Sequence, residues 1–230
     1  MNKHFYGQLF RIVRFLTRRV YPKYTIQLSD SRTGPTVYVS HHQNFFGPFI
    51  AYLWLPIPVR VWVLHVFFDK TSCYQQFVNY TFTVRLKMEK KLASLLAFPL
   101  SALISKFFQS ANAIPVFRGT KKIIDTFRDS VQALKRGEPI LIFPDIEYTN
   151  SSSAMQGMYE GFLYLERYFH SETGQHIDFI PLYISKKTHT VITGEPISFR
   201  DGEQFKSELK IVSQKLHDSI NQLAQKCGDI

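Results

Sequence analysis

The sequence predicts a single α/β domain in which helices flank a mixed sheet, with an amphipathic helix at the N-terminal end. Two observations predict this class. Apolar, β-branched segments alternate with segments of helical periodicity, as strands and helices do in α/β proteins. Hydrophobic residues make up 45% of the 230 residues, which is enough for the core of one ordinary domain. We place the helix within residues 1–23 and the α/β domain in residues 24–230.

The chain is basic, with a formal net charge of +10. Residues 1–29 hold six Lys or Arg and no acid, and residues 60–122 hold ten Lys or Arg and two acids. Such a surface suits an anionic membrane or a nucleic acid. The basic residues lie beside long apolar stretches, and the sequence has no RRM, KH or helix-turn-helix pattern. We therefore expect a lipid surface as the partner and no nucleic acid.

The cysteines predict neither a metal site nor a disulfide framework. The two of them, Cys73 and Cys227, have no partner pattern, so we expect no metal and a reducing compartment. Arg11 and Arg14 interrupt the apolar run that a signal peptide needs. Residues 40–59 are uncharged but contain three prolines, so we do not predict a transmembrane helix there.

Residues 4–20 have helical periodicity with two distinct faces. Arg11, Arg14 and Arg18 share one face. The other face is apolar and holds Phe5, Leu9, Ile12, Val13, Leu16 and Val20. This pattern suits a helix that lies in a membrane interface. It also suits an amphipathic helix packed on its own domain, and the pattern alone leaves both open.

The remaining elements follow from apolar period and from turn formers. Strands are expected where apolar runs alternate or are β-branched, at residues 24–28, 36–39, 59–68, 113–117, 139–143, 177–184 and 190–193. Helices are expected where the period is 3.6, at residues 49–55, 92–108, 121–135, 158–169 and 205–225. Pro99 is expected to bend or split the second of these helices, and Gly137 to end the third. Residues 69–91 show weak periodicity, residues 30–35 predict a turn, and residues 149–157 predict a loop.

The residues that follow the strand at 36–39 are the centre of the functional prediction. The strand stops at Ser40-His41-His42-Gln43-Asn44, and two aromatic residues then lead into Gly47-Pro48. Strand ends are where α/β folds place their chemistry. A histidine at a strand end can act as a general base, because its ordinary pKa lies close to neutral pH.

Two further strands also stop at polar residues. Arg118-Gly119 follow the strand at 113–117, and Pro144-Asp145 follow the strand at 139–143. If the three strands run parallel, their ends bring a base, a cation and a carboxylate to one edge of the sheet. Such a set suits a hydroxyl acceptor that carries an anionic group. The sequence has no G-x-S-x-G, P-loop or G-x-G-x-x-G motif that would point to other chemistry.

The order of these motifs resembles the lysophosphatidate acyltransferase superfamily, the PlsC-like glycerolipid acyltransferases. The resemblance runs from about residue 24 to residue 197. SHHQNFFGP resembles the family's first motif, with His42 at the catalytic histidine, and AIPVFRG resembles the second, with Arg118 at its arginine. IFPDIEY occupies the place of the third motif. Tyr159-Glu160-Gly161 and Phe179-Ile180-Pro181-Leu182 resemble two later family segments.

The resemblance implies an O-acyltransferase that moves a fatty acyl group onto a hydroxyl of a glycerolipid-like acceptor such as 1-acylglycerol-3-phosphate. The donor would be acyl-CoA or acyl-carrier protein, used as a co-substrate, with no bound cofactor. The family's setting implies a peripheral protein on the cytoplasmic face of a membrane, in phospholipid biosynthesis. The implied catalytic residues are His42 and Asp145. The implied substrate-binding residues are His41, Gln43, Asn44, Arg118, Gly119, Glu147 and Gly161.

The first and third motifs depart from the family pattern. The first-motif aspartate, which orients the histidine in the family, would fall at Gly47, and the third-motif arginine would fall at Tyr148. Three replacements for the orienting group stay open: Asp145, Glu147, or Asn44 holding the imidazole neutral. Gly47 also keeps a second hypothesis open, in which the chain is a catalytically inactive lipid- or membrane-binding relative.

Overall fold

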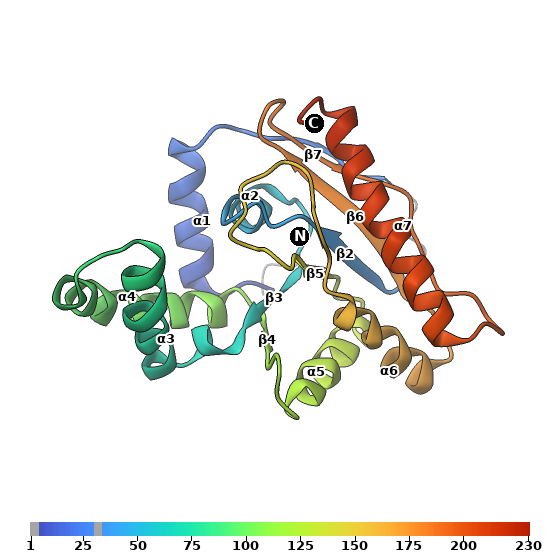
Figure 1. Cartoon of the computed structure of the whole chain (residues 1–230), viewed down its shortest axis with the longest axis horizontal. Coiled ribbons are helices and arrows are strands. Elements are labelled where there is room, and N and C mark those ends of the chain that lie inside the picture. The colour runs from blue at the N-terminus through green and yellow to red at the C-terminus, as the bar shows by residue number, and fades with distance from the viewer. Residues whose placement is uncertain (1–4, 30–33) are drawn as a thin grey trace. The chain divides into compact units, whose positions relative to one another are not determined.

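A computed structural model describes residues 5–29 and 34–230, and Figure 1 shows its elements. The predicted α/β class, a mixed sheet flanked by helices, is confirmed. The chain divides into two compact units, one of Leu16–Val59 with Phe127–Ile230 and one of Arg60–Thr126 with the described part of Asn2–Phe15. The boundary placed at residue 23 stays a prediction. Residues 30–33 of the predicted turn lie outside the described residues.

The first unit contains five strands in the order β1-β7-β6-β2-β5. Their bounds are Thr25–Gln27 for β1, Thr36–Ser40 for β2, Ile140–Ile142 for β5, Asp178–Ser185 for β6 and Thr190–Thr193 for β7. All neighbours are parallel except β6 and β7, which are antiparallel. The β1 strand is at one edge of this set.

The central strand β2 lies between β6 and β5 and is buried along its whole length. Val39 is opposite Ile142 of β5 and Pro181 of β6. A strand covered on both faces reads as a continuous apolar run rather than an alternating one. This explains why β2 is apolar at successive positions. The polar residues begin at Ser40, where the buried strand ends.

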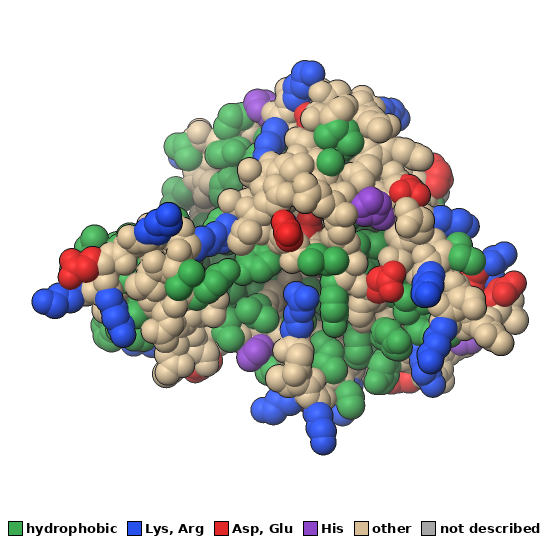
Figure 2. Space-filling view, in the orientation of Figure 1, with side chains coloured by type: hydrophobic (Ala, Val, Ile, Leu, Met, Phe, Trp, Pro, Cys, Tyr) green, Lys and Arg blue, Asp and Glu red, His purple; other side chains and the backbone are tan. Residues whose placement is uncertain are grey.

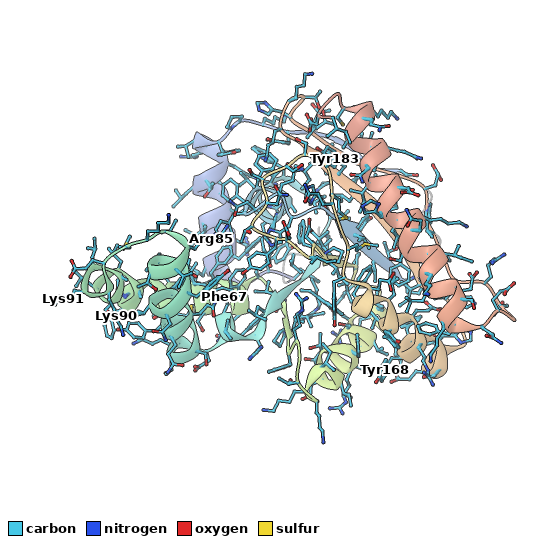
Figure 3. All side chains as sticks on the ribbon, in the orientation of Figure 1. Phe67, Arg85, Lys90, Lys91, Tyr168 and Tyr183 are labelled. Carbon is cyan, nitrogen blue, oxygen red and sulfur yellow. The ribbon has the colours of Figure 1, made fainter. Side chains whose placement is uncertain are left out.

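Helices α2 (Phe46–Trp54), α6 (Tyr164–Thr173) and α7 (Phe205–Lys226) and the 3₁₀ turn η3 (Glu160–Leu163) belong to the first unit, and so does α5 (Ile123–Lys135) from Phe127 on. Helix α7 lies along β6 (Figure 1) and buries an apolar stripe that includes Leu209, Val212, Leu216, Ile220 and Leu223. Tyr183 of β6, marked in Figure 3, is fully buried, and its hydroxyl donates to Asp229 Oδ2 at 2.9 Å. This bond ties the C-terminal residues to the sheet.

The second unit contains the parallel pair β3 (Arg60–Leu64) and β4 (Ile114–Val116) and a set of helices between them in sequence. The helices are the 3₁₀ turn η1 (His65–Phe68), α3 (Lys70–Gln76), the π-helix η2 (Phe77–Arg85) and α4 (Lys90–Ser110). The strand predicted for residues 59–68 stops at Leu64, because His65 turns to hydrogen-bond the Val116 carbonyl through Nδ1 at 3.1 Å. Pro99 lies inside α4 without dividing it.

The weak periodicity of residues 69–91 has a structural cause. The buried residues of this segment are Cys73, Phe77, Val78 and Phe82, which pack with Ala93 and Ala97 of α4. Their spacing is wider than an α-helical stripe, because residues 77–85 form a π-helix with more residues in each turn. A search for a period of 3.6 therefore does not detect this helix.

Helix α1 (Gln8–Val20) differs from the predicted division into a basic and an apolar face, because Phe10 is buried, Arg14 and Arg18 are half-buried, and Arg11 is exposed. The Arg14 guanidinium lies 5.9 Å from the Phe10 ring centroid. The Arg18 Nε donates to the Leu53 carbonyl at 2.6 Å, and its guanidinium lies over Trp54. The apolar residues Ile12, Phe15, Leu16 and Val20 are exposed. Figure 2 shows hydrophobic and basic side chains interspersed on one face of the molecule.

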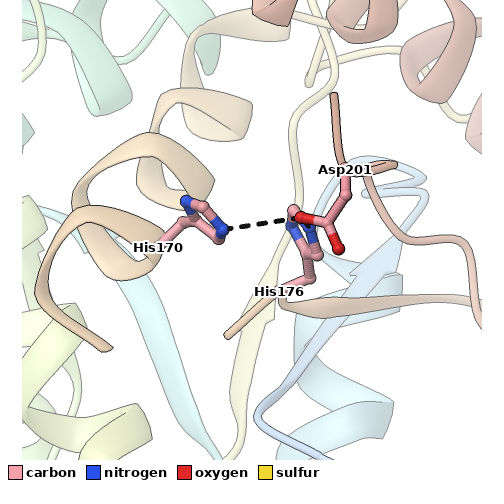
Figure 4. Close-up of side chains that lie close together, drawn as sticks. All are labelled: His170, His176 and Asp201. Carbon is pink, nitrogen blue, oxygen red and sulfur yellow. Dashed lines mark hydrogen bonds and ion pairs between the residues drawn. The ribbon is translucent and has the colours of Figure 1, made fainter. Parts of the chain in front are cut away.

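A group of titratable side chains joins α6 to the start of β6 (Figure 4). His176 Nδ1 lies 2.6 Å from Oε1 of the buried Glu166, and His176 Nε2 lies 3.0 Å from Asp201 Oδ1. The His170 ring stacks on the His176 ring at a centroid distance of 4.5 Å. Partial burial lowers the pKa of His176, but the hydrogen bonds and charges of Glu166 and Asp201 raise it more, so its pKa is raised above 6.5. Both ring nitrogens of His176 are thus satisfied by carboxylates in the protonated form.

We predict that the free energy of unfolding falls as pH rises through the raised pKa of His176. Protonated His176 stabilises the folded chain, so this contribution is complete below the unfolded pKa of 6.5 and is lost above the folded pKa. Urea unfolding of the wild type and His176→Gln at a series of pH values measures it. The difference in stability should shrink with rising pH, and Asp201→Asn should weaken the effect. Parallel stability curves for wild type and His176→Gln would contradict the prediction.

Candidate active site

Two of the three predicted strand ends meet in the first unit. The strands β2 and β5 are parallel neighbours, with Val39 opposite Ile142. His41 and His42 follow β2 directly, and Asp145 follows β5 after Phe143 and Pro144. The expectation that these ends share an edge of the sheet is therefore confirmed. Arg118 follows β4 in the second unit.

His41 and Asp145 form a buried ion pair at this edge. The His41 Nδ1 contacts Asp145 Oδ1, and both side chains are about 95% or more buried. The His41 Nε2 hydrogen-bonds the Ser152 carbonyl at 2.8 Å. Both ring nitrogens of His41 thus face oxygen acceptors within the protein.

Asp145 also holds the main chain that follows β2. Its Oδ2 accepts a hydrogen bond from the His42 backbone N–H at 2.8 Å. The sequence placed Asp145 beside the His42 ring, but its carboxylate meets the His41 ring and the His42 backbone instead. The reason is that both oxygens of the carboxylate are engaged, Oδ1 by the His41 ring and Oδ2 by the His42 N–H.

The half-buried His42 ring is oriented by a main-chain carbonyl. Its Nδ1 hydrogen-bonds the carbonyl oxygen of Asn44. Since a carbonyl only accepts, Nδ1 must carry the proton, and the neutral ring then has its lone pair on Nε2. The rings of Phe143 and Tyr148 lie near His42, at centroid distances of 5.6 and 5.9 Å. A hydrogen bond from Nδ1–H to this carbonyl corresponds to the tautomer that a general base needs.

Two consecutive left-handed residues produce this contact. Gln43 has φ of 46° and Asn44 has φ of 63°. Residues other than glycine rarely adopt the left-handed region, although asparagine does so more often than most. The buried Gln43 side chain anchors the turn by donating through Nε2 to the Ile184 carbonyl at 2.9 Å. Such paired backbone outliers cluster at functional sites.

Gly47 fills a position at which a side chain has no room. A Cβ at this position would lie 2.4 Å from the His41 carbonyl oxygen and 2.9 Å from the His42 carbonyl oxygen. The Gly47 N–H also donates to the His42 carbonyl at 3.0 Å. An aspartate therefore cannot be placed here without moving the main chain of both histidines. Of the three replacements that the sequence left open, the contact to the ring comes from Asn44, and from its backbone rather than its side chain.

The loop after β5 closes over His41. Backbone hydrogen bonds join its two ends, from Ile146 N–H to the Gly157 carbonyl and from Tyr159 N–H to the Pro144 carbonyl. This closure brings Ser152 to His41. Sequence reasoning did not identify Ser152, because it takes part through its carbonyl, and a serine-rich loop gives no signal for that.

The other predicted site residues lie outside this hydrogen-bonded group. Glu147 is exposed in the loop, and Gly161 lies in η3 against the Tyr159 ring. Arg118 is exposed and precedes Gly119, whose φ is +74°. The Phe117 N–H before them hydrogen-bonds Thr126 Oγ1 at 3.2 Å. Glycine adopts this positive φ without strain, so Gly119 allows the turn on which the exposed Arg118 lies.

Comparisons with known proteins give a structural match. Neither a family model nor a curated protein sequence matches the chain. The crystal structure of the 1-acyl-sn-glycerophosphate (LPA) acyltransferase PlsC from Thermotoga maritima is similar, with a TM-score of 0.51 and 11% sequence identity. The match covers 93% of this chain and 79% of that chain. At this identity the likeness shows the fold, which is that of the PlsC acyltransferase.

We predict that Asp145→Ala destabilises the protein by about 3–5 kcal/mol, because it leaves the buried His41 without its counter-charge. Chemical denaturation measures the change. Glu147→Ala is the matched control, since Glu147 is an exposed acid two residues away, and it should change stability by less than about 0.5 kcal/mol. Equal effects of the two substitutions would show that the ion pair does not hold the strand ends together.

We predict that Gly47→Ala lowers the free energy of unfolding by about 1–3 kcal/mol, because its Cβ overlaps two carbonyl oxygens. Gly47→Asp should be at least as damaging. Gly34→Ala is the control, since the nearest atom to its added Cβ is Asp178 Oδ2 at 3.6 Å. If Gly47→Ala is as stable as Gly34→Ala, the carbonyl oxygens of His41 and His42 do not lie as close to position 47 as described.

Proposed function

We propose that this protein is an acyltransferase that moves an acyl group from an acyl thioester to a hydroxyl of a glycerolipid-like acceptor. The observation that carries the proposal is His42, held at the end of β2 in the tautomer with its lone pair on Nε2. The likeness of the fold to PlsC supports the same reaction class. The first proposed acceptor is 1-acylglycerol-3-phosphate, with acyl-CoA or acyl-carrier protein as the donor.

The proposed reaction needs one base and no bound cofactor. His42 Nε2 takes the proton of the acceptor hydroxyl as its oxygen attacks the thioester carbonyl. The carbon–sulfur bond then breaks, and the imidazolium returns the proton to the leaving thiolate. The Asn44 carbonyl accepts from Nδ1–H throughout and favours the imidazolium as it forms. Asp145 and His41 act as positioning residues, because they hold the His42 backbone.

Several finer parts of the proposal rest on the chemistry of single residues. Arg118 would bind an anionic group of a substrate, since it is an exposed guanidinium beside a glycine. Gln43 keeps the turn in place, and Gly119, Glu147 and Gly161 are candidate substrate contacts.

Helix α1 supports a peripheral position on the cytoplasmic face of a membrane. Its arginines Arg14 and Arg18 contact protein groups, whereas Ile12, Leu16 and Val20 are exposed. A soluble helix packs the other way round, with its apolar face inward. Outward apolar residues on a basic segment suit the interface of an anionic bilayer.

The alternative is an inactive lipid-binding relative, and Gly47 is the observation that favours it. In this reading the missing aspartate marks a lost activity. In the proposed function the carbonyl of Asn44 takes over the orientation of the histidine. The two readings differ in whether the pure protein consumes an acyl thioester when a detergent-dispersed acceptor is present.

We predict that His42→Ala lowers kcat about 10²- to 10⁴-fold, the range that a general base contributes. Asn44→Gly should retain activity, because glycine keeps both the carbonyl and the left-handed conformation. Asn44→Val should lower kcat by up to about 10⁴-fold, the cost of a wrongly oriented imidazole, because valine avoids positive φ. Release of free thiol from the donor measures the rate.

Circular dichroism and thermal unfolding control for the fold of these variants. Inactivity of a well-folded wild type toward lysolipid acceptors would favour the inactive relative. Equal activity of Asn44→Gly and Asn44→Val would show that the carbonyl contact does not orient His42.

A further inference from the structure

Helix α4 carries its smallest side chains inward and its largest side chains outward. Four buried positions recur at every fourth residue, namely Ala93, Ala97, Ser101 and Ser105. They face the core of the second unit, where Cys73, Phe77, Val78 and Phe82 are buried. Small residues let α4 approach these buried side chains closely. The inward face of α4 is therefore fully used within its own unit.

The opposite face of α4 is apolar and exposed. Its residues have the spacing i, i+3, i+4, i+7 and i+11, and they are Leu92, Leu95, Leu96, Pro99 and Leu103. Leu95 is 71% exposed, whereas Ala93 and Ala97 are 0% exposed. We call this set the outer stripe of α4. A helix of a soluble protein normally exposes polar side chains on the face turned away from its core. The outer stripe is apolar instead, as expected of a surface that contacts an apolar phase.

Cations stand at both ends of the apolar stretch. Residues 92–105 contain no charged residue, and Lys90, Lys91 and Lys106 flank them. Lys90 and Lys91 are marked together at the start of α4 in Figure 3. On the neighbouring helix α3, the Lys70 ammonium lies 4.5 Å from the ring centroid of Phe98, which is 63% exposed. Lysine side chains of this kind can lie along apolar surface and reach the lipid headgroups.

The end of η2 and the turn before α4 repeat the same composition. Val84 is 61% exposed and Leu86 is 59% exposed, and they alternate with Arg85 and Lys87. Large exposed apolar residues between basic ones are typical of segments that insert at an anionic interface. The residues before α4 thus add to the same kind of surface.

The length of the stretch distinguishes docking from spanning. Helix α4 is the one described helix that is long and apolar enough to cross a membrane. Its 14 uncharged residues rise about 21 Å at 1.5 Å per residue, less than the about 30 Å of a bilayer core. One face of α4 is also committed to the core of the second unit. The helix is therefore suited to one leaflet rather than to both.

We infer that the outer stripe of α4 docks into one leaflet of an anionic lipid bilayer, with its flanking lysines at the headgroups. A second copy of the chain is a poorer occupant, because antiparallel pairing of two such helices would place Lys90 and Lys91 opposite Lys106 of the other copy. The inference does not depend on acyl transfer, and it applies equally to an inactive lipid-binding protein.

A first experiment measures binding of the full-length protein to vesicles of phosphatidylcholine with a minority of phosphatidylglycerol. Leu95→Glu places a charge in the outer stripe without touching the core, and it should weaken binding about tenfold or more. Ile211→Glu is the matched control, since Ile211 is a 40% exposed residue on helix α7 of the other unit. It should bind as the wild type does. Vesicles of phosphatidylcholine alone should bind less. Equal binding of Leu95→Glu and wild type would overturn the inference.

A second experiment reports the surroundings of position 95 directly. A polarity-sensitive maleimide dye is attached to Leu95→Cys in a Cys227→Ser background, with Ile211→Cys as the control site. Native Cys73 should not react, because it is buried and burial raises its pKa to about 11. Adding anionic vesicles should shift the emission to the blue at position 95 and leave it unchanged at position 211.

The second experiment also distinguishes a lipid bilayer from a second copy of the chain as the occupant of the outer stripe. An unchanged emission at position 95 in the presence of bound vesicles would overturn the inference. A blue shift that appears without vesicles as the protein concentration rises would identify a second copy as the occupant, and would overturn it as well.

Discussion

The ion pair of His41 and Asp145 is the interaction on which the candidate site depends. It joins the ends of the parallel strands β2 and β5, and it is closed on its outer side by the Ser152 carbonyl. A buried charge pair is costly to desolvate and needs all of its hydrogen bonds satisfied. Here the second carboxylate oxygen also takes the His42 N–H. The pair therefore fixes the backbone from which the His42 ring projects.

The two adjacent histidines have separate contacts. His41 is buried and both of its ring nitrogens meet oxygen acceptors, whereas the half-buried His42 gives its backbone N–H to Asp145 and directs its ring Nδ1 to the Asn44 carbonyl. The left-handed pair Gln43 and Asn44 then turns the chain back, so that a carbonyl reaches the His42 ring. Positioning and proton transfer are thus divided between neighbours in the sequence.

The strand and helix order could be predicted from the sequence, because apolar period reports burial directly. The pairing of β2 with β5 also followed, since parallel strands carry their polar residues to one edge. Three features could not be predicted. The π-helix η2 breaks the 3.6 period, the Ser152 contact is made by a carbonyl, and the restriction on Gly47 comes from main-chain atoms of His41 and His42. Each depends on backbone geometry, which residue types encode only weakly.

The acceptor that orients His42 is a main-chain carbonyl, and every amino acid at position 44 brings one. A mutation there cannot delete the acceptor; it changes only how readily the backbone adopts positive φ. Asparagine, aspartate and glycine could replace one another during evolution with the device intact, whereas a side-chain carboxylate is lost by one codon change. Relatives that use this device need no acidic residue in the motif. They would be recognised by two successive left-handed residues after a histidine, through torsion angles rather than through alignment.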